Sequence, residues 1–144
     1  MNHTIRFAGG PARLSDDLHL WIDYQYRLIR DAAAREPWNA IPAAYHYALF
    51  DGRGREIIAY HWHPHVEGMT YPHLHISPGA VRLDVIERAG LSAQANALQA
   101  DLAGAHLVTG PIALASVLWL AIAQFSATPL RRDWRRLLPG PGPA

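Results

Sequence analysis

Histidines alternate along two short stretches in the middle of this chain. Five of its nine histidines lie between residues 61 and 77, in the sequence HWHPHVEGMTYPHLHIS. Alternate residues of an extended chain point to the same face of a sheet. A hairpin that turns at Val66–Thr70 gathers these side chains on one face, in the register that pairs His65 with Tyr71, His63 with His73 and His61 with His75. The sequence therefore predicts a histidine cluster.

Acid–base catalysis is one chemistry that such a cluster can perform. Two imidazoles with a pKa near neutrality can act as base and acid on a ribose 2′-hydroxyl and a 5′-oxygen leaving group. In this interpretation His63 and His73 are the acid and base. His65 and Tyr71 assist them, together with His61 and His75.

Metal binding is the second chemistry. Neutral imidazole is the commonest protein metal ligand, and two H-x-H pairs on adjacent strands can supply several nitrogens to one ion. The chain has no cysteine, so thiolate ligands are excluded. The predicted ligands are His61, His63, His75 and Glu67, and the predicted ion is zinc, nickel, iron or manganese. His61-x-His63-x-x-x-Glu67 also resembles the core of the first cupin motif.

A longer series of residues extends over the centre of the chain. It comprises, in order, Tyr45-x-Tyr47, Asp51-x-x-Gly54-Arg55-Glu56-Ile57, Tyr60, Pro64-His65 and Tyr71-Pro72-His73-x-His75. This stretch resembles the centre of the small bacterial TumE-type toxins of toxin–antitoxin pairs. The resemblance implies growth inhibition through RNA, a DNA-binding antitoxin as partner, and roles for His65, His73 and His75. A toxin-like, RNA-directed component of a bacterial two-protein module is the function expected first.

Four arginines near the C-terminus form the remaining feature, at Arg131, Arg132, Arg135 and Arg136. Such a run is ordinarily the solvated face of a helix. Beside Trp134 it can instead contact RNA phosphates or an acidic protein. A non-catalytic interaction module that uses these arginines is therefore a third interpretation. The apolar segment Ile112–Phe125 is expected in the core, with a homodimer interface as the alternative.

Composition indicates a globular protein with one domain. The chain has 144 residues, half of them hydrophobic, and a net charge of +1, which gives no general attraction to polyanions. We expect one domain over residues 1–138 and a disordered Pro/Gly tail over residues 139–144. No secretory signal is recognised, and Ile112–Phe125 is too short to span a bilayer. The sequence therefore predicts a cytoplasmic protein with no membrane association.

The pattern of apolar residues predicts an α+β fold. We expect a small antiparallel sheet of three or four strands packed against N- and C-terminal helices. Residues 16–36 match a helical stripe, with Ser15 as N-cap, although Leu18 to Leu28 also alternate as a strand does. The other expected elements are a strand at His3–Ala8, a loop bounded by Pro37 and Pro42, a meander of strands at 45–50, 55–63 and 71–76, and helices at 92–102, 112–125 and 130–138. The register that decides whether His46 joins the histidine face stays open.

Overall fold

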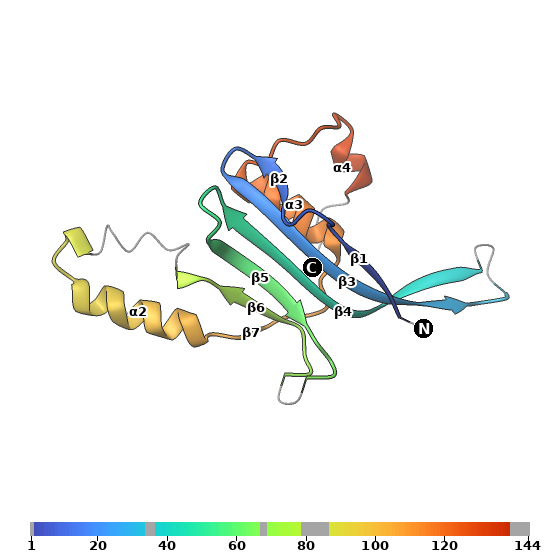
Figure 1. The fold of residues 1–144 in the computed structure, drawn as a ribbon, viewed down its shortest axis with the longest axis horizontal. Coiled ribbons are helices and arrows are strands. Elements are labelled where there is room, and N and C mark those ends of the chain that lie inside the picture. Colours follow the sequence, from blue (N-terminus) through green and yellow to red (C-terminus); the bar gives the residue numbers. More distant parts are fainter. Residues whose placement is uncertain (1, 34–36, 67–68, 79–86, 139–144) are drawn as a thin grey trace.

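One antiparallel sheet dominates the computed structural model, which describes residues 2–33, 37–66, 69–78 and 87–138 (Figure 1). The sheet has seven strands in the order β1-β3-β4-β5-β6-β7, and β2 also pairs with β3. The strands are β1 (Asn2–Arg6), β2 (Ala12–Ser15), β3 (Leu18–Arg30), β4 (Trp38–Asp51), β5 (Glu56–Trp62), β6 (His73–Ile76) and β7 (Leu107–Val108). The helices are α2 (Ser92–Gly104), α3 (Leu114–Phe125) and α4 (Trp134–Leu137).

The predicted fold class is wrong, because the sheet is larger than expected and the N-terminal helix does not exist. Residues 18–30 form β3, which pairs with β4 along its whole length from Leu18↔Asp51 to Arg30↔Trp38. Leu18, Leu20 and Ile22 are buried, while the residues between them are partly exposed. The segment therefore forms the strand that its period-two alternation indicates, and not the helix. Burial against a helix on one face outweighs the helix propensity of the segment.

The predicted loop between Pro37 and Pro42 is also wrong, since β4 already begins at Trp38. Pro42 pairs with Tyr26 where the register between β3 and β4 shifts. Proline has no backbone N–H, and a bulge is one of the few places in a sheet that tolerates it. The two strands continue past this point as a long hairpin arm (Figure 1).

The predicted meander is confirmed as β4, β5 and β6 in sequence order. Asp51 organises the first turn, because its Oδ1 accepts hydrogen bonds from the backbone N–H groups of Arg53 and Arg55, both at 2.9 Å. Gly54 has a φ of 76°, a conformation that glycine adopts at low cost. The turn thus sets the pairing of the two strands that carry the site.

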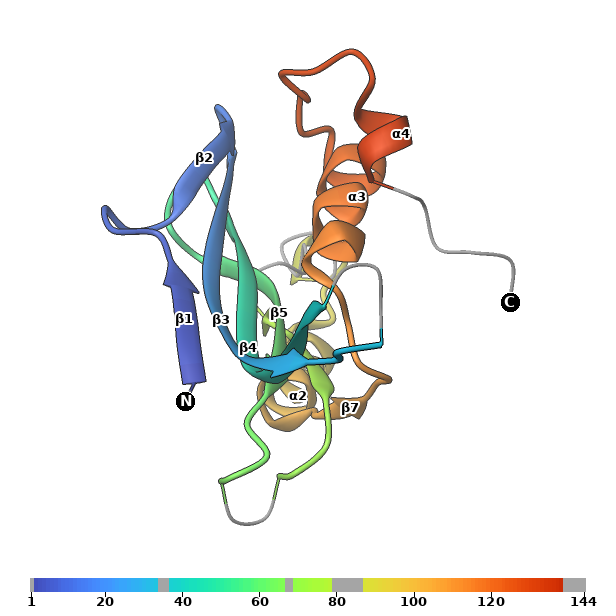
Figure 2. The same cartoon turned by 90° about the vertical axis from the view of Figure 1, so that its right-hand side faces the viewer.

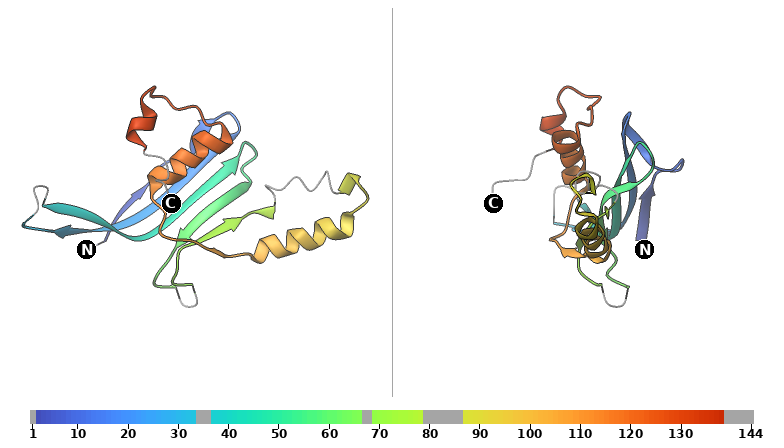
Figure 3. Two further views of the ribbon diagram at one scale, coloured as in Figure 1. Left: turned by 180° about the vertical axis from the view of Figure 1, so that it is seen from behind. Right: turned by 90° about the vertical axis from the view of Figure 1, so that its left-hand side faces the viewer.

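The core lies between one face of the sheet and α3. Figure 2 shows α3 to one side of the sheet, and the view from behind in Figure 3 shows it lying over the sheet, roughly along the direction of the strands. Val117 and Ala121 are the buried residues of α3. They pack with apolar side chains of the sheet, namely Leu18, Leu20, Ile22, Tyr45, Tyr47 and Leu49. The predicted core helix is therefore present, although it buries one stripe and not its whole circumference.

The other helices are more exposed than expected. In α2 only Ala95 is buried, and Leu91 is the N-cap. In the predicted helix 130–138, Leu130 is fully exposed and Leu137 is half exposed. Within the described residues, every helix is too short or too polar to cross a bilayer. The predicted tail at 139–144 lies outside the described residues.

Candidate metal centre

A row of polar side chains crosses the face of the sheet opposite α3. The register places Asp23 beside His46, His46 beside His61, and His61 beside His73, on four neighbouring strands. Each direct pair of residues on adjacent strands points to the same face. His75 lies on the same face of β6, next to Ala59. The strands thus bring together histidines that are far apart in the sequence.

The predicted histidine cluster exists, but the predicted register is displaced by two residues. His61 pairs with His73, not with His75. Strand β5 ends at Trp62, so His63, Pro64 and His65 belong to the connection to β6. Pro64 cannot donate to a strand ladder, which favours an early end to the strand. A shift by two keeps every side chain on its face, so the cluster survives the error in register.

His61 is the centre of the cluster. The distances from its ring centroid are 4.1 Å to His46, 4.7 Å to His75, 5.6 Å to His73 and 5.7 Å to His63. His75 in turn lies 5.0 Å from His73. His61, His73 and His75 each offer a ring nitrogen, and these nitrogens all lie within 4.8 Å of one another. These three histidines are close enough to hold one metal ion.

His73 is oriented by a backbone contact. It is 3 % exposed, and its Nδ1 lies 3.0 Å from the carbonyl oxygen of Tyr71. A carbonyl only accepts, so this contact requires the proton on Nδ1 and leaves the Nε2 lone pair free. Metal-binding histidines are commonly fixed by a partner of this kind. The tautomer of His73 is therefore the one that a metal ligand needs.

Sequence reasoning left His46 undecided and missed His106, and both belong to the cluster. His46 faces the cluster through the register of β4 with β5. His106 precedes β7, and its ring centroid lies 4.2 Å from that of His75 and 5.2 Å from that of His73. The alternation Tyr45-His46-Tyr47 carried a usable signal for His46. Nothing near His106 in the sequence indicates that its strand pairs with β6.

Several ring nitrogens in the cluster are buried without a hydrogen-bond partner among the described residues. They are Nε2 of His46, Nε2 of His61 and Nδ1 of His106. A buried polar atom without a partner costs free energy, about 1–3 kcal/mol. Such atoms in a native protein call for a ligand, and a metal ion or water can supply one.

Burial keeps the central imidazoles neutral. Loss of solvent, followed by repulsion from His46 and His75, lowers the pKa of His61 from 6.5 to about 3. Burial also lowers the pKa of His46, although Glu56 and Asp23 partly oppose this effect. The pKa of His75 is lowered by burial and by His106. Neutral imidazole is the form that binds metals.

The cluster opens into a small hollow of about 260 Å³. Its walls are the five histidines at 61, 63, 73, 75 and 106 together with Val66 and Met69. His63, predicted both as catalyst and as ligand, is thus at the site, but it is not among the three histidines whose nitrogens converge. A hollow of this volume has room for an ion or a small molecule.

The other predicted site residues lie further out. His65 is exposed and lines a different hollow, beside Arg27 and Pro42. The Tyr71 ring lies 6.0 Å from that of His73 and is 39 % exposed. Glu67 lies outside the described residues. Of the predicted set, the structure brings together His61, His63, His73 and His75.

The arginine segment is partly neutralised by its own neighbour. Arg131 and Arg136 both pair with Asp133, at 2.9 Å and 3.0 Å. Arg135 lies over the ring of Trp134, 4.6 Å from its centroid. These contacts leave a weaker positive surface than four free arginines would form.

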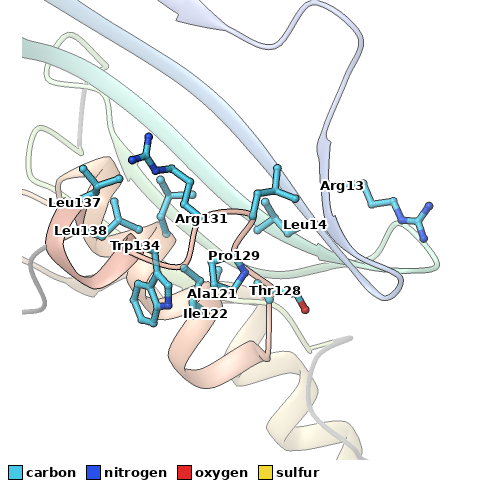
Figure 4. A pocket seen from close by; sticks show the side chains of 13 residues that line it. Arg13, Leu14, Ala121, Ile122, Thr128, Pro129, Arg131, Trp134, Leu137 and Leu138 are labelled. Carbon is cyan, nitrogen blue, oxygen red and sulfur yellow. The ribbon is translucent and has the colours of Figure 1, made fainter.

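A larger cavity of about 390 Å³ lies beneath α4 (Figure 4). Aliphatic and aromatic side chains dominate its walls, including Leu14, Leu118, Ile122, Trp134, Leu137 and Leu138. Among the described residues that line it, the charged ones are Arg13 and Arg131, which pair with Asp16 and Asp133. This cavity therefore offers mainly apolar surface.

The histidine hollow thus has three ring nitrogens that converge, buried nitrogens without a partner among the described residues, and an opening that an ion can enter. A comparison of the chain with known protein families, curated proteins and solved structures finds no match. The resemblance to TumE-type toxins consequently stays a prediction, and the function has to be argued from the site itself.

Proposed function

We propose that this protein binds a divalent transition metal ion through His61, His73 and His75. The observation that carries the proposal is the convergence of three ring nitrogens within 4.8 Å of one another. Around a tetrahedral zinc with Zn–N distances of about 2.0–2.1 Å, two ligand nitrogens lie roughly 3.3–3.5 Å apart. Small rotations of the side chains about χ1 and χ2 bridge this difference.

The chemistry of the ligands favours zinc, nickel or iron over manganese, and we take zinc as the test ion. Imidazole nitrogen suits zinc, copper, iron and nickel, whereas manganese and magnesium prefer oxygen. Among the described residues the convergent set contains no carboxylate. Three histidine ligands also match the set of zinc sites that keep a fourth position for water or substrate.

Elemental analysis of protein purified without a histidine tag tests the proposal. We expect about one zinc per chain in the wild type after exposure to equimolar zinc and gel filtration. His61→Ala should lose the ion, because this substitution removes the central ligand. His65→Ala is the matched control, since its side chain is exposed and lies outside the cluster. Wild-type protein without metal, or full occupancy in His61→Ala, would contradict the proposal.

A second proposal is the toxin-like, metal-free cleavage of RNA by the same cluster. It is supported by His63 and His73, the expected acid and base, which both line the hollow. This function predicts RNA cleavage in the presence of EDTA and growth arrest on expression. His63→Ala should abolish both effects, while His3→Ala, remote from the hollow, should retain them. Cleavage that requires added metal would leave only the first proposal.

A further inference from the structure

His106 is the one histidine of the hollow that comes from the C-terminal part of the chain. It follows α2 and directly precedes β7, whereas the other histidines belong to β5, β6 and their connection. We propose that His106 is a fourth metal ligand, so that the bound ion fastens the segment 105–109 to the sheet. This inference rests on the metal site proposed above and adds to it the group that closes the site.

The register places His106 correctly for this role. Strand β7 pairs with β6 through His73↔Val108 and Leu74↔Leu107. Continued by one residue, the same antiparallel register brings His106 opposite His75. Directly opposite residues share a face, and the two ring centroids are 4.2 Å apart. Strand pairing therefore places the His106 side chain on the same face of the sheet as the other ligands.

The His106 ring also has an unused nitrogen. Its Nδ1 is buried and has no hydrogen-bond partner among the described residues. The neighbouring rings are those of His73 and His75, which belong to the three-histidine set. His106 is itself outside that set, so its ring has to turn toward the ion to bind it. A metal ion in that set would give this nitrogen a partner, because a neutral imidazole nitrogen donates its lone pair to the ion.

Other contacts hold this segment only weakly. Strand β7 has two residues, and Leu107 and Val108 are 47 % and 70 % exposed. The Thr109 N–H donates to the carbonyl oxygen of Pro72 at 2.9 Å. In α2, the helix before this segment, only Ala95 is buried. Little apolar burial therefore anchors 105–109, and a metal–histidine bond would add to the backbone hydrogen bonds that attach it.

Four imidazole ligands change the character of the site. A zinc ion with three protein ligands keeps an open position, whereas an ion with four is closed and structural. With His106 bound, the ion would hold the C-terminal segment. With His106 released, the same ion would expose the position that chemistry requires. The segment 105–109 thus decides which of the two roles the metal has.

Cobalt(II) as a spectroscopic probe and zinc affinity test this inference on the full chain. His106→Gln should weaken zinc binding about tenfold or more and alter the visible absorption of the cobalt protein, because one nitrogen ligand is lost. His106→Cys should restore tight binding and add a thiolate-to-cobalt absorption band. His65→Gln is the control and should match the wild type. Hydrogen exchange supplies a readout independent of affinity: zinc should slow the amides of residues 107–109 in the wild type but not in His106→Gln.

The outcomes separate the two proposals. If the wild type binds no metal, the metal site itself is wrong and this inference falls with it. If His106→Gln binds zinc as tightly as the wild type and gives the same cobalt spectrum, the three-histidine site stands and the role of His106 is overturned. Circular dichroism of each variant verifies that the sheet is intact, and recovery in His106→Cys excludes a merely structural effect of the substitution.

Discussion

At the scale of single residues, the sheet creates an unusual environment for imidazole. His46, His61 and His75 are partly buried beside one another, and desolvation lowers the pKa of each. In the unfolded chain these groups have a pKa near 6.5. The folded, metal-free protein therefore binds fewer protons than the unfolded chain once the pH falls below that value.

This difference predicts an acid-labile apo protein. Stability is fully present above about pH 6.5 and decreases as the pH falls toward the folded pKa of His61, about 3. One such group accounts for at most about 1.4 kcal/mol per pH unit in this window. Urea unfolding with EDTA at pH 7.5, 6.5 and 5.5 measures the effect. His61→Gln should give a shallower dependence, and equal slopes for both proteins would contradict the assignment.

Tyr45 and Tyr47 provide a second, matched test at this scale. Both rings are nearly completely buried and stack at 4.9 Å. The Tyr45 hydroxyl accepts a hydrogen bond from the Ile112 N–H at 3.0 Å, whereas the Tyr47 hydroxyl is buried without a partner among the described residues. Tyr45→Phe should therefore cost about 1–2 kcal/mol, because the Ile112 N–H loses its acceptor.

Tyr47→Phe should be neutral or stabilising by up to about 1 kcal/mol, since it removes an unsatisfied hydroxyl. Chemical unfolding of the two variants and the wild type under one condition gives the comparison. A large loss of stability for Tyr47→Phe would mean that its hydroxyl has a partner, such as an ordered water.

At the scale of elements, the sequence determined more of the site than of the fold. The alternation His61-x-His63 and His73-x-His75 was sufficient to predict a shared face. A shift of the register by two residues leaves each side chain on the same face of the sheet. The exact pairing was predicted wrongly, because the expected strand ran on to His63 and the hairpin to His65, although Pro64 favours the earlier end that β5 has at Trp62. His106 could not be assigned either, because its position depends on the pairing of β7 with β6, far away in the sequence.

The missed strand has a similar cause. Residues 18–30 fit both a helical stripe and a strand alternation. The choice depends on what covers the segment, and the covering element, α3, lies about a hundred residues later in the chain. Local propensity cannot include that burial. The central meander, whose strands pair with their neighbours in sequence, was predicted correctly.

Packing of α3 on the sheet can be tested at Val117. This side chain is 1 % exposed and belongs to the core cluster. Val117→Ala should destabilise the protein by about 1.5–3 kcal/mol, through lost burial and the cavity left behind. Gln124→Ala, at an exposed position in the last turn of the same helix, is the control and should change stability by less than about 0.5 kcal/mol. Comparable losses for both variants would argue against the observed orientation of α3.

At the scale of the whole molecule, the proposed metal binding would be linked to folding. The three converging histidines come together only in the folded sheet, so an ion that binds them stabilises the folded state. At zinc a hundredfold above its dissociation constant, the gain is about 2.7 kcal/mol. For a chain of this length that corresponds to an increase in Tm of about 8 °C.

Calorimetry with and without zinc measures this increase. Magnesium at the same concentration is the control ion and should leave Tm unchanged, since it prefers oxygen ligands. The His61→Ala protein should show no zinc-dependent increase. An equal increase in that variant would indicate binding elsewhere among the nine histidines.

The order of the strands determines which histidines are synthesised first. From β3 to β6 each strand pairs with the next one in sequence, and the three converging histidines are complete once residue 75 has been made. His106 leaves the ribosome about thirty residues later, a delay on the order of seconds. A nascent chain therefore has the ligands to capture an ion while the site still lacks its C-terminal histidine. On the proposed scheme, the three-histidine site would load its ion first, and His106 would close the site afterwards.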